Sequence, residues 1–367
     1  MCPPGLEGLL AVELKNRGVR IGKGVAGGVE FRGTREDLWR ANLWSCIANR
    51  IVVRVDEFHA NSFHELERRA KKIEWSQYLP SGRPVRFRVT SKKSKLYHSD
   101  AVAERLGNAA ARAGAVVADD SNDEEGDSDA QLFVVRLAND VCSISADSSG
   151  ELLHRRGYRQ AVAKAPLRET LAAAMLIGSG WDRKSPLVDP MCGSGTIAIE
   201  GAMMARNIAP GVRRKFAFEM WPDHDAKSWK VMIDEAIAGQ LDRSPARIIA
   251  SDRDAGAVTA SIANAARAQV LEDIEIENRA ISDVEFPPEN GWIVSNPPYG
   301  LRVGESGPLR NLYASLGGIV RKRAPGYVLA LLSADKSLES QLKMDLKEVF
   351  RTSNGGIPVR LVMGKGA

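Results

Sequence analysis

The first half of the chain carries its apolar positions in short helix-like and strand-like units. Leucines at helical spacing predict a first helix from Gly5 to Arg17, ending at Gly18. Asn139 and Asp140 separate two apolar runs, a spacing typical of a β-hairpin. These units predict an α+β region over residues 1–152. Further helices are expected to begin at Thr34, Ser62 and Ser99, and strands are expected at 51–55, 84–90, 132–137 and 141–146.

From about residue 165 the pattern changes to longer units in which apolar strands alternate with helices. Pro166 suits the first turn of a helix that continues through residues 171–177. Strands that alternate with helices of this length favour a doubly wound parallel sheet, here over residues 153–367. A final hairpin is expected around Gly355 and Gly356. The expected strands are 186–189, 247–251, 274–278, 291–295 and 327–332, and the expected helices are 197–204, 226–239, 255–269 and 309–322.

The composition is typical of a globular protein of two or three domains. Of the 367 residues, 44% are hydrophobic and 26% charged, and no run approaches the ~18 apolar residues that span a bilayer. The four cysteines lie far apart without paired spacing, so neither a zinc site nor a disulfide framework is predicted. Nothing near Met1 has the pattern of a signal peptide. A reduced, cytoplasmic setting without a membrane is expected, with monomer and homodimer both open.

Basic residues gather between Arg68 and Lys95, with aromatic residues among them. The net charge is only +5 and the isoelectric point about 9.0, so the distribution of charge is more informative than its sum. Basic and aromatic side chains together suit a phosphate backbone and unstacked bases, although a solvated helix face has a similar composition. An acidic run at 119–129 is expected to be a surface loop. The candidate RNA contacts in this region are Arg83, Arg86, Arg88, Lys92, Lys93, Lys95, Tyr97 and His98.

A glycine-containing loop, Asp189 to Thr196, follows an expected strand and opens an expected helix. Its two glycines let the backbone approach a ligand closely, and its aspartate can accept hydrogen bonds from a charged group. It is not the dinucleotide fingerprint, because Ala198 stands where a third glycine is needed and the next acidic strand end, Asp252, lies roughly 60 residues on rather than ~20. A carboxylate beside the loop would also repel a pyrophosphate. S-adenosylmethionine, which has a cationic amino acid part and no phosphate, fits better.

The tetrapeptide Asn296-Pro297-Pro298-Tyr299 follows the apolar run 291–295. Prolines fix φ and have no N–H, so the carbonyls around them have no helix or ladder to join and are free to accept hydrogen bonds. Asn296 adds a side-chain carbonyl, and Tyr299 adds an aromatic face for a planar ring. The tetrapeptide therefore predicts a holder for the exocyclic amino group of a base. Taken alone, it also fits a loop with a turn asparagine and a half-buried tyrosine.

The cofactor loop and the tetrapeptide together resemble the motif pair of class I methyltransferases that act on exocyclic amines. Further segments resemble bacterial THUMP-domain methyltransferases that modify guanine N2 of large-subunit ribosomal RNA, and this resemblance covers nearly the whole chain. It implies a ferredoxin-like plus THUMP RNA-binding region at 1–152 and a Rossmann-like, S-adenosylmethionine-dependent methyltransferase at 153–367. The segments that carry the wider resemblance are Cys2–Glu7, Lys95–His98, Leu153–Arg159, Ala165–Thr170, Ile208–Gly211 and Glu219–Trp221.

The same resemblance implies roles for individual residues. The donor's ribose would bind Asp252, its adenine would lie near Asp283, and the helix start at Arg168 would close the site. Asn296 would hold the guanine amine in line with the methyl group, and Tyr299 would stack on the ring. The implied cofactor residues are Asp189, Pro190, Gly193, Ser194, Gly195, Thr196, Asp252, Asp283, Arg168, Glu169, Thr170 and Asn296, the implied catalytic residues are Asn296, Pro297, Pro298 and Tyr299, and Arg156 and Arg159 join the RNA contacts.

Other substrates stay open on the residues alone. The same tetrapeptide occurs in adenine N6 and protein glutamine methyltransferases, and transfer RNA is an alternative to ribosomal RNA. A non-catalytic RNA-binding protein is a further alternative, but it would not need the cofactor loop, which is intact. The proposed chemistry needs no metal and no covalent nucleophile. Cys192 has no suggested histidine partner and is expected to be a packing residue.

Overall fold

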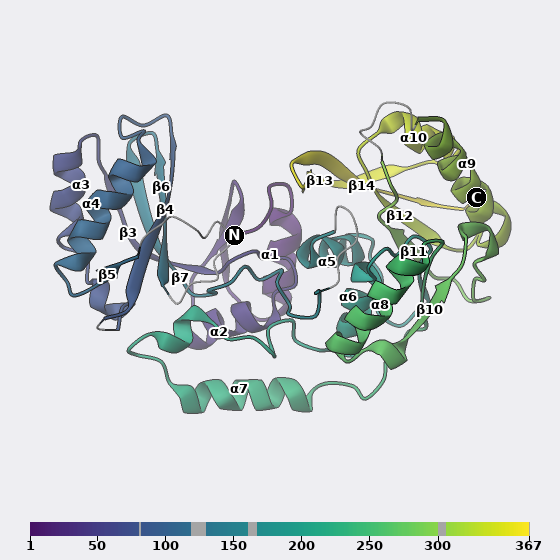
Figure 1. Ribbon diagram of the computed structural model, residues 1–367, viewed down its shortest axis with the longest axis horizontal. Helices are drawn as coiled ribbons and strands as arrows, with labels where there is room; N and C mark the ends of the chain where they lie inside the picture. Colours follow the sequence, from purple (N-terminus) through teal and green to yellow (C-terminus); the bar gives the residue numbers. More distant parts are fainter. Residues whose placement is uncertain (81, 119–129, 161–166, 300–305, 367) are drawn as a thin grey trace. The chain divides into compact units, whose positions relative to one another are not determined.

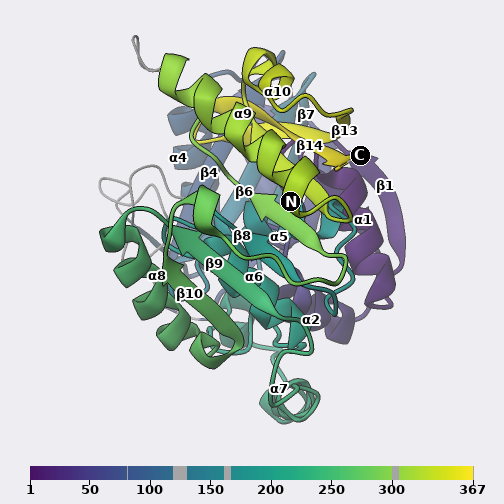
Figure 2. The same cartoon turned by 90° about the vertical axis from the view of Figure 1, so that its right-hand side faces the viewer.

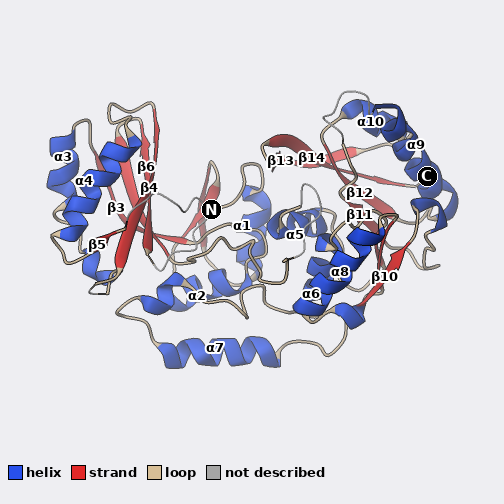
Figure 3. Ribbon diagram, viewed as in Figure 1, coloured by secondary structure: helices blue, strands red, loops and turns tan. Residues whose placement is uncertain are grey.

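The computed structural model describes residues 1–80, 82–118, 130–160, 167–299 and 306–366. Contacts between residues divide the chain into two units, and each unit combines segments that are separated in the sequence. Figures 1 and 3 show the elements of both units. The first unit comprises Met1, Arg50–Leu153 and Arg214–Met232, and the second comprises Cys2–Asn49, His154–Arg213 and Ile233–Ala367.

The first unit has an α+β structure around a five-stranded sheet of order β3-β7-β6-β4-β5. The hairpin predicted at Asn139 and Asp140 joins β6 to β7, and both turn residues have positive φ. Trp75 packs edge-on against Phe87 and Phe133 in its core, with ring centroids 5.7 and 5.0 Å away. The elements are β3 (Val52–His59), α3 (Phe63–Ala70), β4 (Pro84–Lys92), α4 (Ser99–Ala111), β5 (Val116–Val117), β6 (Gln131–Ala138) and β7 (Val141–Asp147). The acidic run 119–129 lies outside the described residues.

The N-terminal segment of the second unit consists of two helices and a small antiparallel sheet. Its elements are α1 (Glu7–Asn16), β1 (Ile21–Val25), β2 (Gly28–Phe31) and α2 (Arg35–Trp44). Thr34 and Asp37 form a capping box at the start of α2. The predicted helix start at Thr34 is thus confirmed. The sequence grouped these residues with the RNA-binding region, whereas their contacts group Cys2–Asn49 with the remainder of the second unit.

The main sheet of the second unit has seven strands in the order β10-β9-β8-β11-β12-β14-β13. Every neighbouring pair from β10 to β12 is parallel, and β14 runs antiparallel to both β12 and β13. The predicted doubly wound sheet and final hairpin are thus confirmed. The strands are β8 (Leu187–Asp189), β9 (Ile248–Asp252), β10 (Ile274–Asn278), β11 (Trp292–Ser295), β12 (Val328–Ser333), β13 (Lys347–Asn354) and β14 (Ile357–Lys365).

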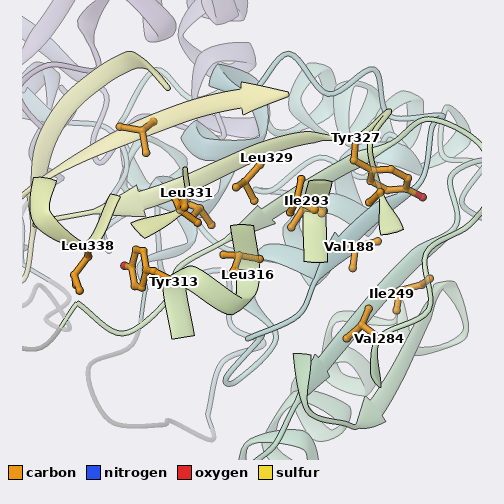
Figure 4. Packing of buried hydrophobic residues seen from close by; sticks show 14 residues of the cluster. Val188, Ile249, Val284, Ile293, Tyr313, Leu316, Tyr327, Leu329, Leu331 and Leu338 are labelled. Carbon is orange, nitrogen blue, oxygen red and sulfur yellow. The ribbon is translucent and has the colours of Figure 1, made fainter. Parts of the chain in front are cut away.

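Helices cover both faces of this sheet, and Figure 2 shows α6 and α8 beside β8, β9 and β10. On the opposite face, Tyr313 and Leu316 of α9 pack with Ile293 and Leu329 in a buried cluster (Figure 4). Among the described residues no helix has the length and apolar character to cross a membrane. The helices are α5 (Glu169–Gly178), α6 (Thr196–Ala205), α8 (Ala255–Ala268), α9 (Ser306–Arg323) and α10 (Lys336–Gln341), and α7 (Ala226–Ala238) crosses the division between the units.

Most predicted elements are present with shifts of a few residues at their ends. Strand β10 has the predicted bounds, 274–278. Helix α5 begins at Glu169 with Arg168 at its N-cap, and Pro166, predicted in its first turn, lies outside the described residues. Ser99 is the first residue of α4 rather than its cap, because His98 occupies the N-cap position.

Candidate active site

The site lies where the strand order of the main sheet reverses. β8 and β11 are parallel neighbours, and the chain leaves β8 toward β9 on one side and β11 toward β12 on the other. At such a switch point the connections diverge and leave a crevice at the carboxyl ends of the strands, where ligands bind in open α/β sheets. Asp189 ends β8 and Asn296 directly follows β11. The two predicted motifs therefore meet at the same edge of the sheet.

Asp189 is linked directly to the second motif. It is 1% exposed, and its Oδ1 accepts hydrogen bonds from Ser295 Oγ at 2.6 Å and from the Met191 N–H at 3.3 Å. Burial raises the pKa of Asp189 to about 7, and the negative charge of Asp252 acts in the same direction. A cationic group bound beside Asp189 would favour its ionised form. A buried carboxylate of this kind suits the ammonium end of a methyl donor.

The loop between β8 and α6 has the backbone that its glycines permit. Gly193 and Gly195 have φ of +53° and +82°, and Gly195 is the N-cap of α6. A Cβ on Gly195 would overlap the Ser261 hydroxyl of α8, whereas a Cβ on Gly193 would meet no atom within 4 Å. Gly195 is therefore required for packing inside the protein. Gly193 faces open space in which a ligand can approach the backbone.

Asn264 on α8 holds the loop from behind and was not predicted from the sequence. Its Nδ2 donates to the Ser194 carbonyl at 3.0 Å, and its side chain is fully buried. A lone asparagine within a helical pattern gives no signal of such a role. The helix itself was predicted, but its contact with a loop 70 residues earlier in the chain is visible only in the structure.

Asp252 ends β9 and lies against the same loop. Its Oδ2 accepts from the Gly193 N–H and its Oδ1 from the Asp254 N–H, both at 3.0 Å. The end of β10 is tied to it, because Asn278 Nδ2 and the Arg279 N–H both donate to the Asp252 carbonyl. Asp283 follows in an exposed short 3₁₀ turn, residues Ile281–Asp283, beyond the end of β10. The structure thus brings Asp252 to the cofactor loop, and it places Asp283 after the next strand.

The tetrapeptide presents an unpaired acceptor beside an anchored aromatic ring. The Oδ1 atom of Asn296 is buried and, within the part of the chain that the structure describes, accepts no hydrogen bond. Pro297 is buried and Pro298 exposed. The hydroxyl of Tyr299 accepts from Asn354 Nδ2 at 2.8 Å, and its ring packs against the core cluster. Asn354, at the end of β13, is the second residue of the site that the sequence did not reveal.

The residues expected to close the site make contacts elsewhere within the second unit. Glu169 is buried with its Oε2 3.2 Å from an Arg159 nitrogen, and burial raises the pKa of Glu169 to about 7. Thr170 Oγ1 donates to Asn49 Oδ1 at 3.3 Å. These contacts join α5 to the segment before it and to the N-terminal segment. They assign Glu169 and Thr170 a role in holding these segments together.

Two of the candidate RNA contacts are internal. The Arg156 side chain is 1% exposed, donates to the Cys46 carbonyl at 2.7 Å and lies 3.6 Å from Glu200. Arg159 donates to the Leu167 carbonyl at 2.7 Å and pairs with Glu169. Both guanidinium groups are engaged by partners within the second unit, which argues against the expected contacts of Arg156 and Arg159 with RNA. Arg86 is also buried, and its side chain offers little surface to a ligand.

The remaining candidates include an exposed group on one loop of the first unit. Tyr97 is 69% exposed, and its ring centroid lies 4.1 Å from that of His98. The loop is held by Asp140 of the β6–β7 hairpin, which accepts from the Lys95 N–H at 2.7 Å. Lys92, Lys93 and Lys95 are exposed around it, and Arg83 and Arg88 are half-buried. This group combines positive charge with accessible aromatic faces.

Cys192 is a packing residue, as expected. It is buried, and burial together with the charges of Asp189 and Asp252 raises the pKa of its thiol well above the usual range. It is therefore a poor nucleophile. Among the described residues, no group of three or more His, Cys, Asp or Glu side chains could hold a metal ion.

The fold and site define a class I methyltransferase: a doubly wound sheet with a glycine loop after its first strand and an acceptor tetrapeptide after its fourth. The family model described as "RMKL-like, methyltransferase domain" matches residues 156–362, and the model of the RlmL ferredoxin-like domain matches residues 1–52. The chain belongs to the RMKL-like methyltransferase family. The match at 1–52 confirms the ferredoxin-like segment that the resemblance implied.

Individual relatives agree with this assignment. A Synechocystis sp. protein with the provisional name RNA methyltransferase slr0064 is 34% identical over 366 residues, which are 98% of this chain and 94% of that protein. The ribosomal RNA large subunit methyltransferase K/L of Desulfotalea psychrophila is 33% identical over 99% of this chain, which spans about half (52%) of that protein. The crystal structure of SMU.472, provisionally named a methyltransferase and complexed with SAH, is 30% identical with a TM-score of 0.87, and the match covers 100% of this chain and 97% of that one.

Proposed function

We propose that this chain transfers a methyl group from S-adenosylmethionine to the N2 amine of a guanosine in large-subunit ribosomal RNA. The cofactor follows from the family and from SMU.472, which holds SAH, the product that remains after the methyl group is transferred. Ribosomal RNA is supported by the names of the K/L relatives, of which this chain spans about half. An exocyclic amine as the methyl acceptor is supported by the geometry of the tetrapeptide, and the choice of guanine N2 rests on the motif resemblance.

One observation carries the proposal: the buried Oδ1 of Asn296, which accepts no hydrogen bond from the described residues. A buried acceptor without a partner costs on the order of 1–3 kcal/mol. Such an atom is useful when a ligand brings the missing donor. An exocyclic amine has two N–H groups, and Asn296 Oδ1 and the Pro297 carbonyl would each accept one.

The second step is proximity to the cofactor. Ser295 directly precedes Asn296 and donates a hydrogen bond to Asp189 at 2.6 Å. Asn296, which would hold the amine, is therefore linked through Ser295 to Asp189, which would bind the ammonium group of the methyl donor. The cofactor supplies a methyl group on a positively charged sulfur. The chain holds the amine in line with it, and positive charge that develops on the amine strengthens its hydrogen bonds to the two carbonyls.

The third step concerns the substrate's conformation. Guanine N2 cannot reach a bound methyl donor from inside a duplex, so the target base must be unpaired or flipped out. The half-buried Tyr299 provides an aromatic face for such a base. The exposed lysines and aromatic rings of residues 92–98 suit contact with the phosphate backbone and unstacked bases of RNA.

The test is methyl transfer from labelled S-adenosylmethionine to a 23S ribosomal RNA transcript, with base identity read by mass spectrometry. Asn296→Ala should lower the rate on the order of a hundredfold, while calorimetric titration shows unchanged SAH binding. Asn290→Ala is the matched control, because Asn290 is an exposed asparagine just before the other end of β11 and should keep full activity. Full activity of Asn296→Ala would contradict the assignment of the acceptor. A methyl group on adenine N6 would contradict the choice of base.

A further inference from the structure

A hydrogen bond from outside the motifs holds the ring of Tyr299. Asn354 Nδ2 donates to Tyr299 Oη at 2.8 Å across 55 residues of sequence. Asn354 ends β13, which is separated from β11 in the sheet by β12 and β14. The contact therefore spans the carboxyl edge of the sheet from its outermost strand to the segment that follows β11.

The position of Asn354 is rigidly determined. It pairs with Ile357 across a two-residue turn, in which Gly355 and Gly356 have φ of +56° and +83°. Positive φ at both central residues is the geometry of the tightest β-hairpins, whose twist matches that of the flanking strands. The side chain of Asn354 thus projects from the end of a fixed hairpin.

The N-terminal segment braces the same strand. A Cβ on Gly5 would overlap the carbonyl oxygen of Arg351 and lie 2.9 Å from its carbon. This close approach places the turn that contains Gly5 directly against β13. The φ of Gly5, +91°, is also one that glycine adopts most readily. An edge strand covered in this way has less freedom to shift.

Tyr299 needs such an external support. It follows two prolines, and its ring packs at the margin of the core cluster of the sheet. Packing restrains the ring on one side, and the hydrogen bond to its hydroxyl restrains the opposite end. A ring that stacks on a base must keep its plane fixed, because stacking depends on parallel faces at close contact.

We propose that Asn354 is a positioning residue for methyl transfer, which orients the Tyr299 ring against the target base through the β13–β14 hairpin. This inference rests on the proposed function of the tetrapeptide. It assigns the C-terminal hairpin a part in substrate alignment, separate from cofactor binding. Asn354 would act through Tyr299 and not on the reacting atoms.

The experiment measures kcat/KM for methyl transfer to the RNA transcript, with SAH affinity and thermal stability measured on the same variants. Asn354→Ala and Tyr299→Phe each remove the hydrogen bond and should each lower kcat/KM about fivefold, the effect of one neutral hydrogen bond. The double variant should show about the same fivefold loss and not ~25-fold, because both changes remove one interaction. SAH affinity should stay unchanged throughout.

Asn354→Asp provides a rescue that a purely structural role would not give. A carboxylate cannot donate, but the tyrosine hydroxyl can reverse the bond and donate to it. Asn354→Asp should therefore keep nearly full activity when Tyr299 is present, and its combination with Tyr299→Phe should show about the same fivefold loss of kcat/KM as the alanine variant. Ser353→Ala, at an exposed position on the same strand, is the matched control and should be fully active.

The outcomes separate this inference from the proposed function. Multiplicative losses in the double variant, or full activity of Asn354→Ala in an active protein, would overturn the role of Asn354 and leave the methyltransferase assignment intact. A lack of methyl transfer by the unaltered chain would overturn both. A fall in melting temperature that accounts for the lost activity would also contradict a positioning role.

Discussion

Replacing each glycine of the cofactor loop with alanine should separate folding from cofactor binding. Gly195→Ala places a Cβ on the Ser261 hydroxyl and 3.1 Å from Ser261 Cβ, at a backbone with φ of +82°. The left-handed conformation costs ~1–2 kcal/mol and the overpacking adds ~1–3 kcal/mol. Gly193→Ala has only the conformational cost, because its Cβ meets no atom within 4 Å. Its Cβ would instead occupy the space through which the cofactor approaches the loop.

Calorimetric unfolding without SAH measures the loss of stability, and the shift of the melting temperature on adding SAH measures cofactor binding. The transition that SAH shifts also identifies the unit that holds the cofactor. At roughly 2–4 °C per kcal/mol, we expect Gly195→Ala to lower the melting temperature on the order of 10 °C and Gly193→Ala by only a few degrees. SAH affinity should fall more in Gly193→Ala. Adding Ser261→Ala to Gly195→Ala should restore part of the stability. Equal destabilisation by both alanines, or no effect of Ser261→Ala, would refute this reading of the loop.

Three further outcomes are expected. Ser295→Ala removes the hydroxyl donor from the buried Asp189 carboxylate and should weaken SAH binding on the order of tenfold at pH 7.5; calorimetric titration that shows unchanged affinity would contradict it. Burial raises the pKa of Asp189 to about 7, and the ammonium group of SAH needs the ionised form of this carboxyl group. The affinity for SAH should therefore fall as the pH drops from 8 to 6, and below that pKa the decrease should approach tenfold per pH unit. Asp189→Asn should abolish this pH dependence. Arg156→Ala removes the cationic partner of the buried Glu200, which keeps the hydrogen bond from the Tyr158 hydroxyl, and should cost ~3–5 kcal/mol of stability. Lys93→Ala should keep stability and weaken RNA binding with a shallower salt dependence in filter-binding assays. The reverse pattern would contradict the separation of internal and exposed cations.

Local patterns predicted the elements of the site well, because its motifs are continuous in sequence. Asp189 to Thr196 and Asn296 to Tyr299 each follow a buried strand, and parallel strands bring such ends to one edge of the sheet. Strand β10 was predicted with its observed bounds, since isoleucine and glutamate alternate over residues 274–277. The glycines of the loop were expected to let the backbone approach a ligand closely, and the structure adds that Gly193 and Gly195 both have positive φ.

Contacts between distant segments could not be predicted in this way. Asn354 and Asn264 reach their partners across 55 and 70 residues, and isolated asparagines have no distinguishing pattern. Arg156 was expected to contact RNA through the family resemblance of its segment, and only the fold shows that Glu200 and the Cys46 carbonyl surround it. The short helix α10, six residues long, has too few turns to show helical periodicity.

The most direct measurement is mass mapping of ribosomal RNA from cells that lack this protein, complemented with either the unaltered chain or Asn296→Ala. We predict that one N2-methylguanosine of the large-subunit RNA is absent without the protein, returns with the unaltered chain and stays absent with Asn296→Ala, although that variant folds and binds SAH. Restoration of the modification by Asn296→Ala, or loss of a methylated adenine in place of guanine, would contradict the proposed site and its substrate.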